Sequence, residues 1–303
     1  MKKRILSLVL AAMMLLTLAA CSVDNGSGTP SGGGNTGSGS VGLSISTLNN
    51  PFFVSLSEGA KAKASEAGVN LIVVDAGDDP AKQTNDIDDL ISKKISVLIV
   101  NPVDSDAVAP AVKDAIAAGI KVVSVDRVVN GVDVDCAIAS DNVLGAQKAT
   151  EYLLSLVGEG AKVAELEGVP GASATIDRGE GFHNVADEHL NVVSKQTANF
   201  NRSEGMTVME NMLQANPDIT GVFAHNDEMA LGAVEAISGK DIVVIGFDAT
   251  DDALTAVDGG KMAATVAQKP DLMGQTAVEI AMKLIAGESV EKSIPVEVEL
   301  VTK

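Results

Sequence analysis

Short apolar runs, each typical of a buried β-strand, repeatedly end in residues that bind hydroxyl groups. Val97–Val100 is followed by Asn101, and Val122–Val125 is followed by Asp126 and Arg127. The same arrangement recurs at Asn50, Asn226, Asp248 and Gln268. In open parallel α/β sheets, ligands bind beyond the carboxyl ends of the strands. The pattern therefore predicts a site that holds a small polyol.

The residue types at these strand ends suit a sugar. Asp126, Arg127 and Asp248 offer charged partners at strand ends, and Arg178 offers another from the segment 174–188; hydrogen bonds to charged partners are about twice as strong as neutral ones. A sugar hydroxyl both donates and accepts, and an amide side chain matches it because one head carries a donor and an acceptor. Such amides are present at Asn50, Asn101, Asn226 and Gln268.

Aromatic rings could pack against the C–H faces of a sugar. The chain has no Trp, one Tyr and six Phe. Phe52 and Phe53 follow Asn50 and Pro51, and Pro51 suits the first turn of a helix. Phe200 lies at another strand-to-helix junction. These rings are candidates for the ligand site, although each could equally be an ordinary core residue.

A glycoside hydrolase is the enzyme class that this set of residues could serve, with Asp126 and Asp248 as the carboxylate pair. Arg127 directly follows Asp126, and a positive charge that close disfavours the raised pKa that a general acid needs. The sequence shows no Ser-His-Asp order, and His183, His189 and His225 lack metal-ligand spacing. We therefore expect no catalytic residues, no metal and no cofactor.

The order of elements predicts an α/β fold. Val/Ile/Leu-rich runs at 42–47, 69–74, 96–100 and 121–125 alternate with amphipathic segments at 53–67, 81–93 and 105–118. Asp104 and Ser105 are expected to cap the last of these helices. This alternation is typical of parallel sheets covered on both faces. It continues with strands near 161–166, 191–197, 219–224, 242–247 and 262–267, helices near 142–157, 174–188, 203–215, 227–238, 250–258 and 272–286, and a last strand at 295–301.

So many strands would overload one sheet, so we expect two doubly wound parallel-sheet lobes with a break near Ser140 and Asp141. Cys136 lies in an apolar run and is expected to be a buried small residue. The net charge of −19 argues against nucleic acid as a partner.

The N-terminus predicts export. Residues 1–20 combine a basic start with a short apolar stretch, as a signal peptide does, and end in Leu18-Ala19-Ala20-Cys21, which resembles the lipobox of bacterial lipoproteins. In that class Cys21 is lipidated and becomes the first mature residue; an ordinary secretory signal with a chance cysteine is the alternative. Residues 21–40 form a Gly/Ser tether, which predicts an extracytoplasmic protein anchored to the cell membrane.

Several motifs resemble bacterial ribose-binding proteins, and they occur in the same order from about residue 41 to the C-terminus. They are Ser46-Thr47-Leu48-Asn49-Asn50-Pro51-Phe52-Phe53, Asn101-Pro102-Val103-Asp104-Ser105-Asp106-Ala107, Val125-Asp126-Arg127, Ile138-Ala139-Ser140-Asp141-Asn142, Arg178-Gly179-Glu180-Gly181-Phe182, Asn226-Asp227-Glu228-Met229-Ala230-Leu231-Gly232 and Gly246-Phe247-Asp248. The resemblance implies the type I periplasmic binding protein fold, with a hinge of three crossings. The lobes would comprise 41–140 plus 269–297, and 141–268 plus 298–303.

The resemblance also implies roles for individual residues. Hydrogen bonds to ribose would come from Asn50, Asp126, Arg127, Arg178, Asn226, Asp248 and Gln268. Phe52, Phe53 and Phe200 would pack against its faces, and Ser46, Asn101, Ser140, Val169 and Phe247 would line or support the pocket. The expected partners are D-ribose or a related monosaccharide and the membrane permease of an ABC importer, with a chemoreceptor as a further candidate. The protein itself is expected to be a monomer.

Three departures from the family pattern stand out. Ala249 occupies a position where these proteins usually have Gly, His225 one where they usually have Gln, and Ile176 replaces a frequent Arg. Two other functions share this fold. A sugar-responsive repressor would need an N-terminal helix-turn-helix, where this chain has a signal-like segment. A binding protein for another aldose, or for a furanose-like signal molecule, stays open because pocket polarity does not count carbons.

Overall fold

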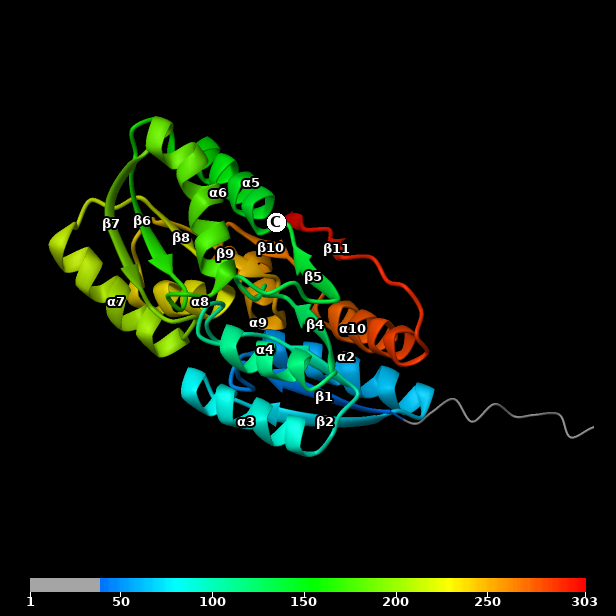
Figure 1. Ribbon diagram of the computed structural model, residues 1–303. Helices are drawn as coiled ribbons and strands as arrows, with labels where there is room; N and C mark the ends of the chain where they lie inside the picture. The colour runs from blue at the N-terminus through cyan, green and yellow to red at the C-terminus, as the bar shows by residue number, and fades with distance from the viewer. Residues whose placement is uncertain (1–38) are drawn as a thin grey trace, which may run out of the picture. The chain divides into compact units, whose positions relative to one another are not determined.

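The computed structural model describes residues 39–303, so the signal-like segment, Cys21 and nearly all of the tether lie outside the described residues. The chain forms two α/β lobes, each built on a six-stranded sheet (Figure 1). The first sheet has the order β11-β5-β4-β3-β1-β2 and the second the order β12-β10-β9-β8-β6-β7. This agrees with the two doubly wound lobes predicted from the sequence.

The first lobe carries the earlier strands. Its strands are β1 (Ser40–Ile45), β2 (Asn70–Asp75), β3 (Val97–Val100), β4 (Lys121–Val125), β5 (Cys136–Ser140) and β11 (Ser293–Val296). Its helices are α2 (Pro51–Ala67), α3 (Pro80–Ser92), α4 (Ala109–Ala117) and α10 (Pro270–Ile285). Separate apolar clusters lie under α2 and α10 on one face and under α3 and α4 on the other, so the sheet is covered on both sides. Cys136 is fully buried, as expected.

The second lobe repeats this plan. Its strands are β6 (Lys162–Glu167), β7 (Asn191–Thr197), β8 (Gly221–Ala224), β9 (Val243–Asp248), β10 (Ala264–Ala267) and β12 (Glu299–Thr302). Its helices are α5 (Asn142–Val157), α6 (Ser173–His189), α7 (Arg202–Ala215), α8 (Asp227–Ala236) and α9 (Asp251–Asp258). Two buried apolar clusters again lie on opposite faces of the sheet.

Helix α10 returns to the first lobe from the end of β10 and packs against α2, and Figure 1 shows the two helices side by side. Two glycines permit the close approach. A Cβ at Gly59 would lie 2.2 Å from the carbonyl oxygen of Asp271, and one at Gly274 would lie 2.0 Å from that of Leu56. Any side chain at either position would force the helices apart, and the first lobe would lose part of its cover.

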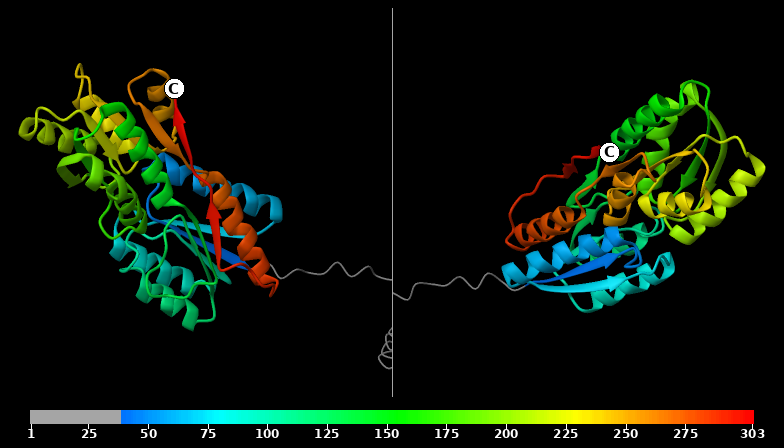
Figure 2. Two further views of the ribbon diagram at one scale, coloured as in Figure 1. Left: turned by 90° about the horizontal axis from the view of Figure 1, so that it is seen from above. Right: turned by 180° about the vertical axis from the view of Figure 1, so that it is seen from behind.

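The prediction of a single last strand is wrong. Residues 295–301 are not a single strand but belong to two, β11 and β12, which lie in different sheets and appear as separate red arrows in Figure 2. Strand β11 is parallel to β5, whereas β12 is antiparallel to β10. The chain therefore crosses between the lobes three times, after β5, after β10 and between β11 and β12.

The helix expected at 105–118 is also shorter than predicted. It begins at Ala109, with Pro110 in its first turn, and Asp104 caps a preceding turn by accepting from the amides of Asp106 and Ala107. Proline fixes the backbone angle that a helix start needs, which places the start at this later position. Ser105 is thereby released to contact the other lobe.

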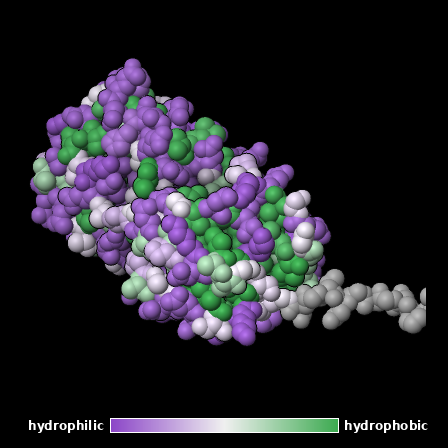
Figure 3. Space-filling view, in the orientation of Figure 1, coloured by the Kyte–Doolittle hydropathy of each residue, from purple (hydrophilic) through white to green (hydrophobic). Residues whose placement is uncertain are grey.

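The surface of the second lobe is mostly hydrophilic in the view of Figure 3, whereas apolar residues are more concentrated over the first lobe. Within residues 39–303, none of the helices combines the length and the apolar character that a membrane crossing requires.

Candidate functional site

The carboxyl ends of the strands in the two sheets face a small cavity between the lobes. Side chains from both lobes line it: Asn50, Phe52, Phe53, Asp126, Arg127, Ala174, Arg178, Phe200, Asn226, Asp248 and Gln268. All the polar members are buried. The cavity is therefore lined largely by polar side chains that are shielded from solvent.

Helix caps orient two of the amides. The Oδ1 atom of Asn50 accepts from the amide of Phe52 at 2.9 Å, and the Oδ1 atom of Asn226 accepts from that of Met229 at 3.0 Å. Each side chain satisfies a helix N-terminus with its oxygen. The NH₂ group of each amide is therefore held in a fixed direction and can donate to a ligand.

Asp126 and Arg127 form the polar wall of the first lobe. Asp126 has a left-handed backbone (φ 65°), an unusual conformation for a non-glycine residue, which turns the chain sharply after β4. Asn101 Nδ2 donates to Asp126 Oδ2 at 3.2 Å, and Arg127 Nη1 donates to the carbonyl of Pro102 at 2.8 Å. Within the described residues, Oδ1 of Asp126 and Nε of Arg127 are buried with no hydrogen-bond partner. Buried polar atoms are normally paired, so these two indicate the position of a polar ligand.

Arg178 is the main cation of the second lobe. It extends from α6, where its Nε donates to Asn142 Oδ1 at 2.9 Å and its Nη1 donates to the carbonyl of His225. Its guanidinium carbon lies 3.9 Å from the ring centroid of Phe247, a cation–π contact that helps to hold the guanidinium in place. These contacts fix the planar head of Arg178 next to the cavity.

Asp248 and Gln268 join the site to a crossing between the lobes. Gln268 Nε2 donates to Asp248 Oδ1 at 2.7 Å, and Ser140 Oγ donates to Gln268 Oε1 at 2.8 Å. Ser140 ends β5 and Gln268 follows β10, so this chain of hydrogen bonds runs from the cavity to two of the three crossings.

Aromatic rings flank Arg127 on two sides. Its guanidinium carbon lies 5.0 Å from the Phe53 centroid and 5.3 Å from the Phe200 centroid. Phe53 belongs to the first lobe and Phe200 to the second, so the stack spans the interface. Gly168 provides the space for Phe200, because a Cβ there would lie 2.0 Å from that ring.

Burial shifts the pKa values of the charged groups. Desolvation raises the pKa of Asp126, against the opposing effect of Arg127. Desolvation also raises the pKa of Asp248 well above its ordinary value, although the nearby Arg178 lowers it. The pKa of Asp227, buried beside the site, rises to about 6 for the same reason. The carboxylates are therefore held at a cost that a hydroxyl donor would reduce.

Most of the sequence-predicted site residues meet at this cavity, and five of them do not line it. Asn101, Ser140 and Phe247 lie behind the lining, where they hold Asp126, Gln268 and Arg178. Ser46 and Val169 are also absent from the lining. The backbone amide of Ser46 donates to Asn101 Oδ1 at 3.1 Å, so Ser46 contributes to the position of Asn101. Ala174 lines the cavity and was missed, although it lies one helical turn before Arg178, a spacing that puts both on one helix face.

The three departures also have defined positions. Ile176 is 55% exposed and does not line the cavity. His225 is fully buried, and its Nε2 lies 2.9 Å from Oε1 of the buried Glu165. Ala249 has a left-handed backbone with φ 56°. No cluster of potential metal ligands occurs among residues 39–303.

Two α/β lobes around a buried polar site define a protein that binds a small ligand between its lobes. The family model described as "Periplasmic binding protein domain" matches residues 41–289, and the chain belongs to this family.

Named relatives cover nearly the whole chain. It is 51% identical to the ribose import binding protein RbsB of Bacillus subtilis, over 100% of both chains. It is 49% identical to the protein of the same name from Escherichia coli, over 87% of this chain and 90% of that one. Among solved structures, an ABC transporter solute binding protein from Bacillus halodurans with bound myo-inositol superposes with a TM-score of 0.84 at 35% identity, covering 89% of this chain and 96% of that chain.

Proposed function

We propose that this protein binds D-ribose between its lobes and delivers it to the membrane permease of an ABC importer. The observation that carries the proposal is a pair of buried atoms, Asp126 Oδ1 and Arg127 Nε, which have no hydrogen-bond partner among residues 39–303 and belong to the lining that the polar residues of the second lobe share. An acceptor next to a donor suits a hydroxyl group, which needs both. The 51% identity to a ribose import binding protein supports ribose as the sugar.

The proposed roles divide by chemistry. Hydrogen bonds to the sugar come from the polar lining of both lobes, and Phe52, Phe53 and Phe200 pack against its apolar faces. Asn101, Ser140 and Phe247 act indirectly, since each holds a lining residue in position. The protein acts by binding, without a chemical step on the sugar.

The proposal extends to the protein's location. Residues 1–20 direct export, Cys21 carries a lipid, and the Gly/Ser tether lets the monomeric binding domain move near the outer side of the cell membrane. The lobes, 41–140 plus 269–297 and 141–268 plus 298–303, close about the three crossings when the sugar binds. A chemoreceptor that reads the closed form would be a second partner.

Calorimetry on the protein without residues 1–21 tests the ligand. We expect one D-ribose per chain with a Kd near 1 μM, which corresponds to about −8 kcal/mol. Deoxyribose should bind more weakly by about 1–3 kcal/mol, because it leaves a buried partner unsatisfied. The panel of sugars also includes myo-inositol, which is bound in a similar solved structure, and D-apiose, because one relative is named a D-apiose import binding protein. Tighter binding of either than of ribose would reassign the ligand, and equal binding of ribose and deoxyribose would contradict the polar grip.

A further inference from the structure

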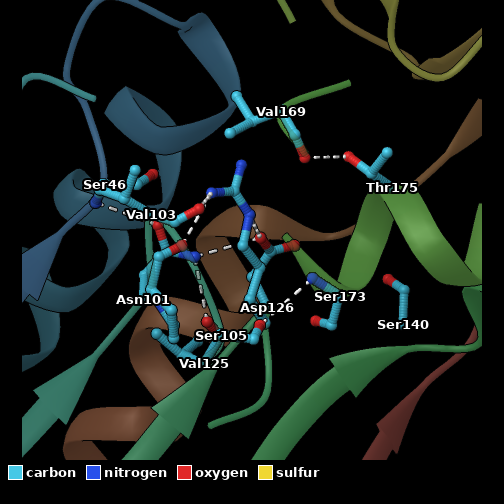
Figure 4. A network of polar contacts seen from close by, with 12 residues as sticks. Ser46, Asn101, Val103, Ser105, Val125, Asp126, Ser140, Val169, Ser173 and Thr175 are labelled. Carbon is cyan, nitrogen blue, oxygen red and sulfur yellow. Dashed lines mark hydrogen bonds and ion pairs between the residues drawn. The ribbon is translucent and has the colours of Figure 1, made fainter. Parts of the chain in front are cut away.

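A compact set of hydrogen bonds joins the two lobes away from the crossings. Ser105 donates from its amide to the carbonyl of Gly171 at 3.0 Å and accepts at Oγ from the amide of Ser173 at 3.2 Å. Ser173 in turn accepts at Oγ from the amide of Val128 at 3.1 Å. Among the described residues, these three are the hydrogen bonds that link the lobes outside the crossings. Figure 4 shows Ser105 and Ser173 facing each other.

Both sides of this contact are fixed within their own lobe. On the first lobe, the carbonyl of Ser105 accepts from the amide of Asn130 at 2.8 Å. On the second lobe, Thr175 Oγ1 donates to the carbonyl of Val169 at 2.8 Å, which closes the loop that carries Gly171. Ser105 is fully buried and Ser173 is 6% exposed, so water competes little for these bonds.

Gly171 determines how closely the lobes approach. Its backbone is left-handed (φ 85°), and a Cβ there would lie 2.2 Å from Oδ2 of Asp104 on the first lobe. A side chain at this position is therefore disfavoured twice, by the backbone conformation and by the opposite lobe.

The contact is separate from the ligand cavity. Ser105, Val128, Gly171 and Ser173 do not line it, although Ser173 precedes the lining residue Ala174. Val128 likewise follows the lining residue Arg127, so the contact and the cavity are adjacent but distinct, and the contact residues themselves do not face the sugar.

We propose that Ser105, Gly171 and Ser173 form a latch that keeps part of the ligand-free population closed and raises the affinity for every sugar by the same factor. The part concerning affinity rests on the proposed function. The apparent Kd equals the Kd of the closed form divided by the closed fraction, so a change in the latch multiplies all sugar affinities alike. The three residues are positioning residues, because they act on the lobes and not on the sugar.

Paired substitutions separate the latch from general damage. Gly171→Ala is compared with Gly239→Ala, because Gly239 also has a left-handed backbone (φ 79°) but nothing within 4 Å of its added Cβ. Ser105→Ala and Ser173→Ala are compared with Ser155→Ala, whose exposed hydroxyl bonds only within α5. Melting temperatures confirm that each variant is folded.

Binding is measured with ribose and with the next-best sugar of the panel. We expect Ser105→Ala and Ser173→Ala each to raise the Kd for both sugars about fivefold, the factor that corresponds to the loss of one net hydrogen bond. Gly171→Ala should weaken both by more than tenfold. Dissociation should accelerate while the relative affinity for the two sugars stays constant. A change in selectivity, or affinities within a factor of about two of the wild type, would overturn the latch.

A second measurement needs no sugar. Spin labels at Lys113→Cys on α4 and Glu210→Cys on α7 report the distance between the lobes, because each helix belongs to a different lobe. Only these two sites are labelled, since Cys21 is replaced by Ser and Cys136 is buried. We expect the ligand-free distance distribution to contain a closed population that Gly171→Ala removes and Gly239→Ala retains. A distribution that lacks this population in the parent, or that Gly171→Ala leaves unchanged, would overturn the latch even if ribose proved to be the wrong ligand.

Discussion

Gln268 donates to Asp248 through the same amide group that accepts from Ser140. One side chain therefore orients a carboxylate in the cavity and bridges two crossings between the lobes. An amide is suited to this double role, because its donor and acceptor ends are fixed in one plane. The geometry of the site and the geometry of the hinge are consequently linked at this residue.

Replacing Gln268 should weaken sugar binding. In Gln268→Leu, Asp248 loses its donor and Ser140 its acceptor, so we expect a loss of about 1–3 kcal/mol in the binding free energy. Calorimetry measures the loss, with Gln214→Leu on the exposed side of α7 as the matched control. Equal affinities for the two variants would show that the bridge has no role in binding.

Polar and aromatic wall residues should differ in their contributions. Asp126→Ala leaves Arg127 and a sugar hydroxyl without a charged partner, and we expect a cost of about 2–5 kcal/mol in binding. Phe52→Ala removes apolar contact and should cost about 1–3 kcal/mol. Asp133→Ala, at an exposed position, serves as the control. A larger effect of Phe52→Ala than of Asp126→Ala would contradict the assignment of roles.

Sugar affinity should decrease as the pH falls from 7 to 5. Burial raises the pKa of Asp126 and Asp248 in the ligand-free protein, and hydroxyl donors favour their ionised forms in the complex, so binding releases protons. For ligand-free stability the sign is opposite: a carboxyl whose pKa is higher folded than unfolded favours the folded state at low pH and loses that contribution as the pH rises through the folded pKa.

Calorimetry in two buffers with different ionisation enthalpies measures this proton release. Thermal melts at both pH values should show that the stabilisation by ribose is smaller at pH 5 than at pH 7. Proton uptake on binding, or an affinity that increases towards pH 5, would be inconsistent with ionised carboxylates in the complex.

Ala249→Gly should stabilise the protein. Ala249 has a left-handed backbone, which costs roughly 1–2 kcal/mol for a residue with a Cβ, whereas Gly adopts it freely. Part of the gain is offset by the larger entropy of Gly in the unfolded chain, so we expect a net increase of about 0.5–1 kcal/mol in the free energy of unfolding. Urea denaturation measures it. The control Ala117→Gly, at an exposed helical position, should decrease stability by about 0.5–1 kcal/mol.

Membrane attachment should depend on Cys21. A Cys21→Ser chain should appear in the soluble fraction or keep residues 1–20 uncut, because the Gly/Ser tether contains no other apolar anchor. Cell fractionation with an antibody against the binding domain distinguishes these forms, and Ser22→Ala should fractionate like the wild type. Normal membrane recovery of Cys21→Ser would refute lipidation at this residue.

The sequence predicted the strand ends well, because a parallel sheet places the residues that follow its strands at one edge. Asp126, Asn226 and Asp248 all reach the cavity for this reason. Asn101 follows a strand in the same way yet lies behind Asp126, since the sharp turn at Asp126 brings the latter forward. Which of two neighbouring strand ends reaches the ligand depends on backbone turns that periodicity does not encode.

Contacts between lobes were beyond the reach of sequence patterns. Ser105 looked like a helix cap, because Ser commonly takes that role, but its hydroxyl accepts from Ser173, 68 residues away. Likewise, the apolar pattern of 295–301 predicts one strand. The structure shows two strands there, because the segment pairs first with the sheet of the first lobe and then with the sheet of the second. Local sequence propensity indicates that a serine will form a capping hydrogen bond or that an apolar run will join a sheet, whereas the tertiary structure determines the partner.

The division of the last residues between β11 and β12 also determines when folding can finish. Strand β11 completes the first sheet, β12 completes the second, and α10 covers the first sheet only after the whole second lobe has been synthesised. Each sheet therefore receives its last strand only when the end of the chain is made, and the pairing of β11 with the distant β5 is of the non-local kind that forms slowly. A chain that has not yet reached β11 lacks an edge strand in each lobe, which favours the unfolded state that passage through a membrane requires, and a chain terminated before β11 yields neither lobe intact.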